Sequence, residues 1–195
     1  PRYHLRNTPK VIGGVTPQCT EVTIALYNAA VDTIVPVSSP KTAEMVKLME
    51  NTFRAVNIGL ANAMAIMCDM LGMDVWEVIK AATSKPFGYM PFYPGPGVGG
   101  HCIPVDPLYL SWKMKTLHYN SQYIQLASEM NAHMPHYVMD KITNDLNYDG
   151  TAVRGATVVV LGVTYKRAID GWGTRQGLEV LRVWCGKGGE GGCWG

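Results

Sequence analysis

PFYPGPGVGGHCIPVDP, residues 91–107, is the stretch around which the chain is organised. Its four glycines and five prolines exclude a regular helix or a central strand. They predict a shaped loop whose backbone can approach a ligand closely, because glycine has no Cβ. Cys102 ends this loop and Asp106 follows four residues later. If Cys102 opens a short helix, its thiolate gains from the unpaired N–H groups of that terminus, and Asp106 lies one turn on.

The alternative for residues 91–107 is a proline-rich connector with a buried, unreactive cysteine, which is common for an isolated cysteine. The five cysteines are scattered and odd in number, so they predict no disulfide framework and favour a reducing cytoplasm. The histidines are dispersed, and none pairs with a cysteine at a zinc-finger spacing. No metal site is expected.

Before the loop, the sequence predicts a long helix. Ser39 is a good N-cap, Pro40 suits the first position and Gly72 stops the helix at C′. A helix with apolar residues on more than one side packs against two neighbours, one of which could be a second subunit. Asp74 then caps a further helix through about Ala82. The apolar positions of the long helix, spaced three or four apart, are Val46, Met49, Phe53, Val56, Leu60, Met64 and Met67.

Residues 1–38 predict the end of an α/β domain. A strand at Val11 is followed by a helix from Thr16, as N-cap, to about Ala30, and then by a short edge strand at residues 33–37. Val22 and its apolar neighbour one turn on, Leu26, are expected on the inner face of that helix.

The chain after the loop predicts more helix and then a second α/β unit. A helix is expected over residues 108–115 and another from Ser121, with Pro135 breaking or restarting it. Residues 156–162 predict a strand buried on both faces. A helix resumes at Leu178, and the glycine-rich residues from 185 onward predict nothing structured.

Composition narrows the class of protein. At 195 residues the chain is one large or two small domains, and 47% hydrophobic residues suffice for a packed core. A net charge of +2 gives no case for nucleic acid or a membrane surface. No apolar run approaches the roughly 20 residues of a membrane-spanning helix.

Five stretches carry a family resemblance. Residues 95–107 resemble the active-site loop of the UDP-glucose/GDP-mannose dehydrogenase family, and residues 83–93 most resemble the branch that oxidises UDP-N-acetylglucosamine or its mannosamine epimer. Residues 44–57 are similar to the lysine-and-asparagine catalytic helix of the family. Residues 9–14 are similar to the stretch that closes its NAD-binding domain. Residues 162–166 are similar to the first strand and loop of the family's UDP-binding domain.

The resemblance implies an α/β fold with a mainly helical central domain between parts of two Rossmann-like domains. Residues 1–38 would be the remnant of the NAD-binding domain, residues 39–150 the central dimerisation and catalytic domain, and residues 151–195 the truncated start of the UDP-binding domain. A homodimer joined through the central helix is implied as well.

The resemblance also implies a reaction. The C6 hydroxyl of a UDP-N-acetylhexosamine would become a carboxylate in a four-electron oxidation that reduces two NAD⁺. Cys102 would form a thiohemiacetal and then a thioester. Lys47 and Asn51 would stabilise developing oxyanion charge, although such a pair taken alone usually forms a solvated helix face. Asp106 would position or deprotonate the hydrolytic water.

For substrate binding, the resemblance implies contacts from Tyr93, Gly95, Gly99 and Lys166. Beyond Lys166 the chain departs from the family, because Gly173 stands where an arginine is expected. No Gly-x-Gly-x-x-Gly opens a βαβ unit, so the chain is expected to carry the substrate half of the enzyme and to be inactive alone. A non-catalytic helical dimerisation module with an unreactive cysteine is one alternative function. A cysteine hydrolase that uses Cys102 and a histidine is another, although no hydrolase-type motif surrounds the cysteine.

Overall fold

The computed structural model describes residues 3–161 and 176–194, and the described part is mostly helical with small parallel sheets. The chain divides into two compact units, Pro1–Asn51 and Thr52–Gly195. The sequence-based expectation of an α/β chain with a mainly helical middle is confirmed. Among the described helices, none has the length and apolar character needed to cross a membrane.

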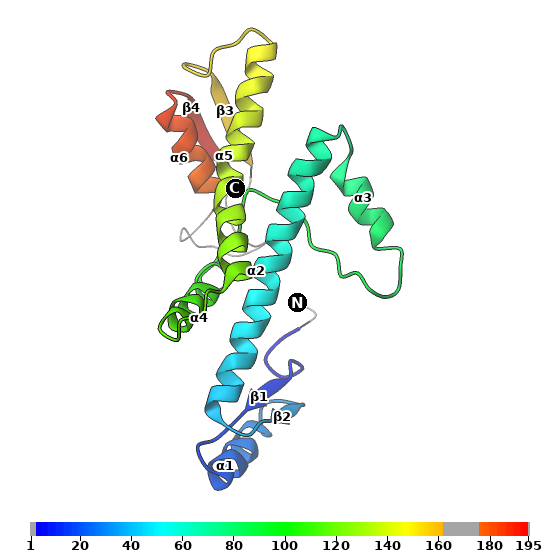
Figure 1. Ribbon diagram of the computed structural model, residues 1–195, viewed down its shortest axis with the longest axis vertical. Helices are drawn as coiled ribbons and strands as arrows, with labels where there is room; N and C mark the ends of the chain where they lie inside the picture. The colour runs from blue at the N-terminus through cyan, green and yellow to red at the C-terminus, as the bar shows by residue number, and fades with distance from the viewer. Residues whose placement is uncertain (1–2, 162–175, 195) are drawn as a thin grey trace. The chain divides into compact units, whose positions relative to one another are not determined.

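The first unit holds a parallel βαβ arrangement, labelled in Figure 1. Strand β1 (Lys10–Ile12) pairs in parallel with β2 (Ile34–Pro36), and helix α1 (Pro17–Tyr27) connects them. Thr16 caps α1 as predicted, because its side chain accepts a hydrogen bond from the Cys19 N–H.

The predicted inner face of α1 is wrong. Val22 and Leu26 are both exposed, and the half-buried positions are instead Thr20, Thr23 and Ile24. Within this unit α1 has a two-stranded sheet to cover, and so small a partner buries little of a helix.

Helix α2 (Pro40–Met70) confirms the predicted long element and both of its ends. At the start, the Ser39 hydroxyl accepts a hydrogen bond from the Thr42 N–H at 3.2 Å. At the end, Gly72 adopts a φ of +66°, and the Met73 N–H reaches back to the Cys68 carbonyl at 2.8 Å.

The burial along α2 differs from the predicted apolar stripe. Large apolar side chains such as Met49 and Leu60 are exposed, whereas Ala55, Gly59 and Asn62 are buried. In the second unit the reason is a close helix approach: a Cβ added to Gly59 would lie 3.2 Å from the Cα of Ala127 on α5. Small residues are therefore required on this face, and the large ones are left outside.

After α2 the second unit continues with α3 (Val75–Ala82), α4 (Asp106–Lys115) and α5 (Gln122–Tyr148). Asp74 caps α3 as predicted, accepting from the Trp76 N–H at 2.9 Å. Residues 83–105, all of them described, form neither helix nor strand, as the glycines and prolines predict.

Pro135 does not break α5. The helix runs through it for 27 residues, and Pro135 is buried. A proline has no N–H for the carbonyl four residues earlier, which here belongs to Asn131. Gly97 of the loop lies against that carbonyl: an added Cβ would be 2.7 Å from the Asn131 oxygen. Tertiary packing has overridden the local signal.

The chain ends in a second small parallel sheet, of β3 (Thr157–Leu161) and β4 (Glu190–Trp194), with α6 (Gln176–Gly186) between them in sequence. Helix α6 packs on α5, beside these strands in Figure 1, around Met139, Val180 and Trp184.

Two expectations about this region are wrong. Strand β3 is not buried on both faces, because its residues alternate between exposed and half-buried. Residues 190–194, expected to be unstructured, form β4 in the described part of the chain, and the Trp184 indole N–H donates to the Glu190 carbonyl at 2.9 Å.

Candidate active site on the glycine- and proline-rich loop

Cys102 and Asp106 lie one turn apart, as the sequence predicts. The Asp106 N–H donates to the Cys102 carbonyl at 2.8 Å, and the Val105 N–H donates to the same oxygen at 3.2 Å. However, α4 begins at Asp106, so the expectation that Cys102 opens the helix is wrong. Cys102 sits in the preceding turn, where its thiol is free and exposed. The thiol is therefore accessible to a reagent or ligand from solvent.

Aromatic contacts hold the start of the loop. Phe92 meets Phe53 of α2 edge to face, with ring centroids 5.6 Å apart. Tyr93 stacks on Trp76 of α3 at 6.1 Å, with the ring planes 21° apart. Both geometries are favourable for aromatic pairs. The loop is therefore tied to α2 and α3 before it reaches its glycines.

A buried amide network holds the middle of the loop. It consists of Asn62, Asn131, the Gly95 N–H and the Ala55 carbonyl. Gly95 donates to Asn62 Oδ1 at 2.9 Å, Asn62 Nδ2 donates to Asn131 Oδ1 at 2.9 Å, and Asn131 Nδ2 donates to the Ala55 carbonyl at 3.1 Å. Asn62 and Asn131 were not among the predicted site residues, because a single asparagine in a helix gives no sequence signal of burial.

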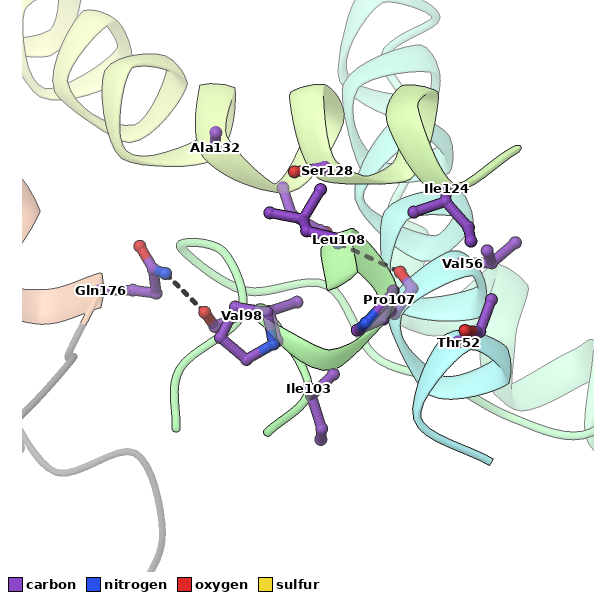
Figure 2. Close-up of a pocket in the computed structure, with 13 residues that line it drawn as sticks. Thr52, Val56, Val98, Ile103, Pro107, Leu108, Ile124, Ser128, Ala132 and Gln176 are labelled. Carbon is purple, nitrogen blue, oxygen red and sulfur yellow. Dashed lines mark hydrogen bonds between the residues drawn. The ribbon is translucent and has the colours of Figure 1, made fainter. Parts of the chain in front are cut away.

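The far end of the loop borders a cavity of about 110 Å³ in the second unit. Figure 2 shows Val98, Ile103 and Pro107 on the loop side of this cavity, with Gln176 Nε2 donating to the Val98 carbonyl at 2.5 Å. The walls are largely apolar. The other residues that line it are Thr52, Ala55, Val56, Pro104, Leu108, Ile124, Ser128, Asn131 and Ala132.

Lys47 and Asn51 lie on the part of α2 that belongs to the first unit. Although they are four residues apart, they differ in environment: Asn51 is fully buried, whereas the Lys47 side chain is 59% exposed. Lys47 Nζ lies 3.7 Å from Glu50 Oε2, a surface pair of small energetic value. The lysine is therefore able to exchange Glu50 for another anion.

The residues predicted to bind substrate differ in their exposure and hydrogen bonding. Tyr93 is exposed beside Trp76, and Gly99 is half-buried. Gly95 donates its N–H to Asn62, so the group it can still offer a ligand is its carbonyl. Lys166 lies outside the described residues.

A charged cluster that sequence reasoning missed joins α2 to α5. Asp69 accepts hydrogen bonds from Lys141 and, at 2.6 Å, from the Tyr137 hydroxyl. The hydrogen bonds from Lys141 and Tyr137 hold the pKa of Asp69 below its usual value. Burial, and then the bond to Asp69, raise the pKa of Tyr137 to about 12. The cluster lies beside the loop, at an open pocket also lined by Pro94.

Two glycines after β1 are tightly packed within the first unit. Gly13 and Gly14 follow β1 and lead into α1. A Cβ on Gly13 would be 2.2 Å from the Ser39 carbonyl oxygen, and one on Gly14 would be 2.5 Å from the Thr20 nitrogen. The chain's own backbone therefore fills the space beside both glycines.

Comparison with known proteins places this site in context. Residues 41–133 match the central domain of the UDP-glucose/GDP-mannose dehydrogenase family. The UDP-N-acetyl-D-mannosamine dehydrogenase of Methanococcus maripaludis is 38% identical over 174 residues, which are 89% of this chain and 39% of that protein. The NDP-N-acetyl-D-galactosaminuronic acid dehydrogenase of Ralstonia solanacearum is 36% identical over the same shares of the two chains.

Solved structures agree with these relatives. The UDP-D-ManNAc dehydrogenase of Pyrococcus horikoshii matches with a TM-score of 0.89 and 33% identity, over 97% of this chain and 44% of its own. The UDP-N-acetyl-mannosamine dehydrogenase Cap5O of Staphylococcus aureus matches with a TM-score of 0.81 and 34% identity, over 98% and 44%. The chain thus spans about two fifths of the length of the relatives it matches.

Proposed function

Because residues 41–133 match the central domain of the UDP-glucose/GDP-mannose dehydrogenase family, we propose that the chain is the substrate and catalytic portion of an NAD-dependent nucleotide-sugar 6-dehydrogenase. The proposed overall reaction is the four-electron oxidation of a UDP-N-acetylhexosamine from the C6 alcohol to the carboxylate. UDP-N-acetylmannosamine is favoured among the possible substrates by the names of the relatives.

The observation that carries the proposal is the exposed thiol of Cys102 one turn before Asp106, within the matched central domain. In the proposed role, the Cys102 thiolate adds to the C6 aldehyde of the sugar and forms a thiohemiacetal. Once this is oxidised to a thioester, Asp106 positions or deprotonates the water that hydrolyses it. The oxidising equivalents would come from NAD⁺.

The other assigned residues have supporting roles. The Lys47 ammonium is proposed to stand where alkoxide charge develops, and the Asn51 amide to donate to the same oxygen. Tyr93, Gly95 and Gly99 are proposed to face the nucleotide sugar. Exposure of Lys47 and Tyr93 is what such contacts require.

The chain is also proposed to act as a homodimer in the cytoplasm. The exposed apolar side chains of α2, which include Leu60, Met64 and Met67, are of the kind that a second subunit covers. The same proposal divides the chain into three parts. They are an NAD-binding remnant at residues 1–38, a central domain at residues 39–150 and the start of a UDP-binding domain at residues 151–195.

The test is alkylation of Cys102 by iodoacetamide with and without UDP-N-acetylmannosamine. The nucleotide sugar is expected to slow modification of Cys102 while leaving that of Cys185, an exposed free thiol in the same chain, unchanged. Cys19 is a poorer reference, because hydrogen bonding to Thr16 lowers the pKa of its thiol. Equal Cys102 rates at saturating nucleotide sugar would count against the proposal.

A matched variant separates binding from chemistry. Cys102→Ser is expected to keep affinity for the nucleotide sugar and to stall turnover at or before the thioester. Full four-electron turnover by Cys102→Ser would refute the nucleophile. An unreactive Cys102 with no affinity for a nucleotide sugar would favour the alternative, a non-catalytic dimerisation module.

A further inference from the structure

Side-chain amides of two helices form a hydrogen-bond network with the loop that ends in Cys102. The Gly95 N–H is bonded to Asn62 of α2, and Asn62 is bonded to Asn131 of α5. Asn131 in turn donates to the Ala55 carbonyl of α2. The amide network thus joins three segments that are far apart in sequence.

Burial makes this network demanding. Asn62 is 0% exposed and Asn131 is 7% exposed. A buried amide is costly unless its donors and acceptors are used, so loss of one member leaves its neighbours unsatisfied. The members of such a network act together rather than as independent contacts.

Asn131 fixes the loop a second time through its backbone. Its carbonyl, which Pro135 cannot serve with an N–H, lies where a Cβ on Gly97 would be 2.7 Å away. Gly97 has a φ of +115°, a conformation that favours glycine. The neighbouring Val98 carbonyl is bonded to Gln176 of α6. Residues 95–98 are therefore contacted by the side-chain amides of Asn62 and Gln176 and by the backbone carbonyl of Asn131.

We infer that Asn62 and Asn131 are positioning residues that set the path of the loop and, through it, the place of Cys102. In this role they act through the loop, whose Gly95 lies seven residues before the thiol, and not on a reacting atom. The catalytic consequence rests on the proposed function, whereas the fixing of the loop does not.

Amide hydrogen exchange at Gly95 tests the inference directly on the whole chain. In the parent protein the Gly95 N–H should be protected although it lies outside helix and strand. Asn62→Ala should speed its exchange by about tenfold or more, and Asn131→Ala by a smaller factor, because a buried hydrogen bond is lost or loosened. The double variant should fall short of the product of the two effects.

Asn57→Ala is the matched control. Asn57 lies on the same helix, and its amide donates to the Phe53 carbonyl of its own helix at 2.7 Å. Exchange at Gly95 in Asn57→Ala should stay within about threefold of the parent, since no bond to the loop is removed.

The second readout follows the site. In Asn62→Ala the concentration of UDP-N-acetylmannosamine that half-protects Cys102 from iodoacetamide should rise by about tenfold or more, while Cys185 alkylation stays unchanged. If the nucleotide sugar does not protect Cys102 even in the parent, the proposed function fails, and the exchange data still decide the role of the network.

Two results would overturn the inference. One is an unprotected Gly95 N–H in the parent, which needs no variant and so holds even if Asn62→Ala does not fold. The other is a folded Asn62→Ala whose Gly95 exchange and Cys102 protection both match those of Asn57→Ala.

Discussion

Asn51 and Lys47 illustrate how much neighbouring side chains on one helix can differ. Asn51 is withdrawn from water, whereas the Lys47 side chain is exposed and pairs weakly with Glu50. In the proposed function, both side chains would stabilise the charge that develops on a substrate oxygen.

Lys47→Ala should therefore reduce the rate of nucleotide-sugar oxidation by about 10²–10³-fold if Lys47 stabilises the oxyanion. The measurement is NADH formation from the nucleotide sugar by an active protein that contains this chain. Lys41→Ala, an exposed lysine in the first turn of the same helix, serves as the control. A loss of less than about threefold would mean that Lys47 is an ordinary solvent-exposed lysine with no catalytic role.

Asp69→Asn tests the cluster with Tyr137 and Lys141 through pH. The pKa of Asp69 is lowered in the folded chain, so its stabilising effect is present above the unfolded pKa of about 4 and is lost as the pH falls through the folded pKa. The free energy of unfolding should therefore be lower in the variant at pH 7, and the difference should shrink towards pH 3. Urea unfolding at both pH values measures it.

Glu129→Gln, an exposed carboxylate on α5, is the control for this comparison. A difference between parent and Asp69→Asn that stays constant from pH 7 to pH 3 would show that the lowered pKa contributes nothing to stability.

Among the elements, those with capping signals were predictable from sequence, and their burial was not. Ser39 and Gly72 mark the ends of α2, and Asp74 the start of α3, because caps act locally on the backbone. Burial depends on neighbours that a sequence does not name. Asn62 lies inside because α5 approaches α2 there, and Leu60, two residues away, lies outside.

Pro135 and β4 were missed for a related reason. A proline can stay in a helix when packing elsewhere holds both halves, as the burial of Pro135 and Asn131 indicates. Residues 190–194 have little strand propensity of their own, and they form β4 because β3 offers a parallel partner. Of the site, the loop, Cys102 and Asp106 were predictable, whereas the amide network was not.

Gly59→Val tests the close approach of α2 and α5. The new side chain would crowd Ala127, whose Cα lies 3.2 Å from the position of the first added carbon. The free energy of unfolding should fall by about 1–3 kcal/mol, as in other overpacked cores. Met45→Val, at an exposed position of the same helix, controls for the β-branched residue. An equally stable Gly59→Val would mean that the helices separate freely.

For the whole molecule, the exposed apolar side chains of α2, which include Leu60, Met64 and Met67, call for a partner. Soluble monomers rarely leave so many large apolar side chains together on one helix. A second copy of the chain is the partner that the proposed function supplies.

Leu60→Glu and Met64→Glu should each weaken self-association by at least about tenfold, because an unpaired carboxylate is costly to bury. Sedimentation equilibrium measures the dissociation constant. Tyr148→Glu, at an exposed position near the end of α5, is the control and should leave it unchanged. A parent chain that stays monomeric at high concentration would remove the dimer from the proposal.

Gly97 and Gly72 both adopt positive φ, and their surroundings give them opposite evolutionary freedom. Gly72 has open space where a side chain would go, so residues that tolerate a left-handed backbone, such as asparagine, can replace it. At Gly97 any side chain would meet the Asn131 oxygen and also strain the backbone. A saturation library selected for folding should thus return several amino acids at position 72 and glycine alone at position 97.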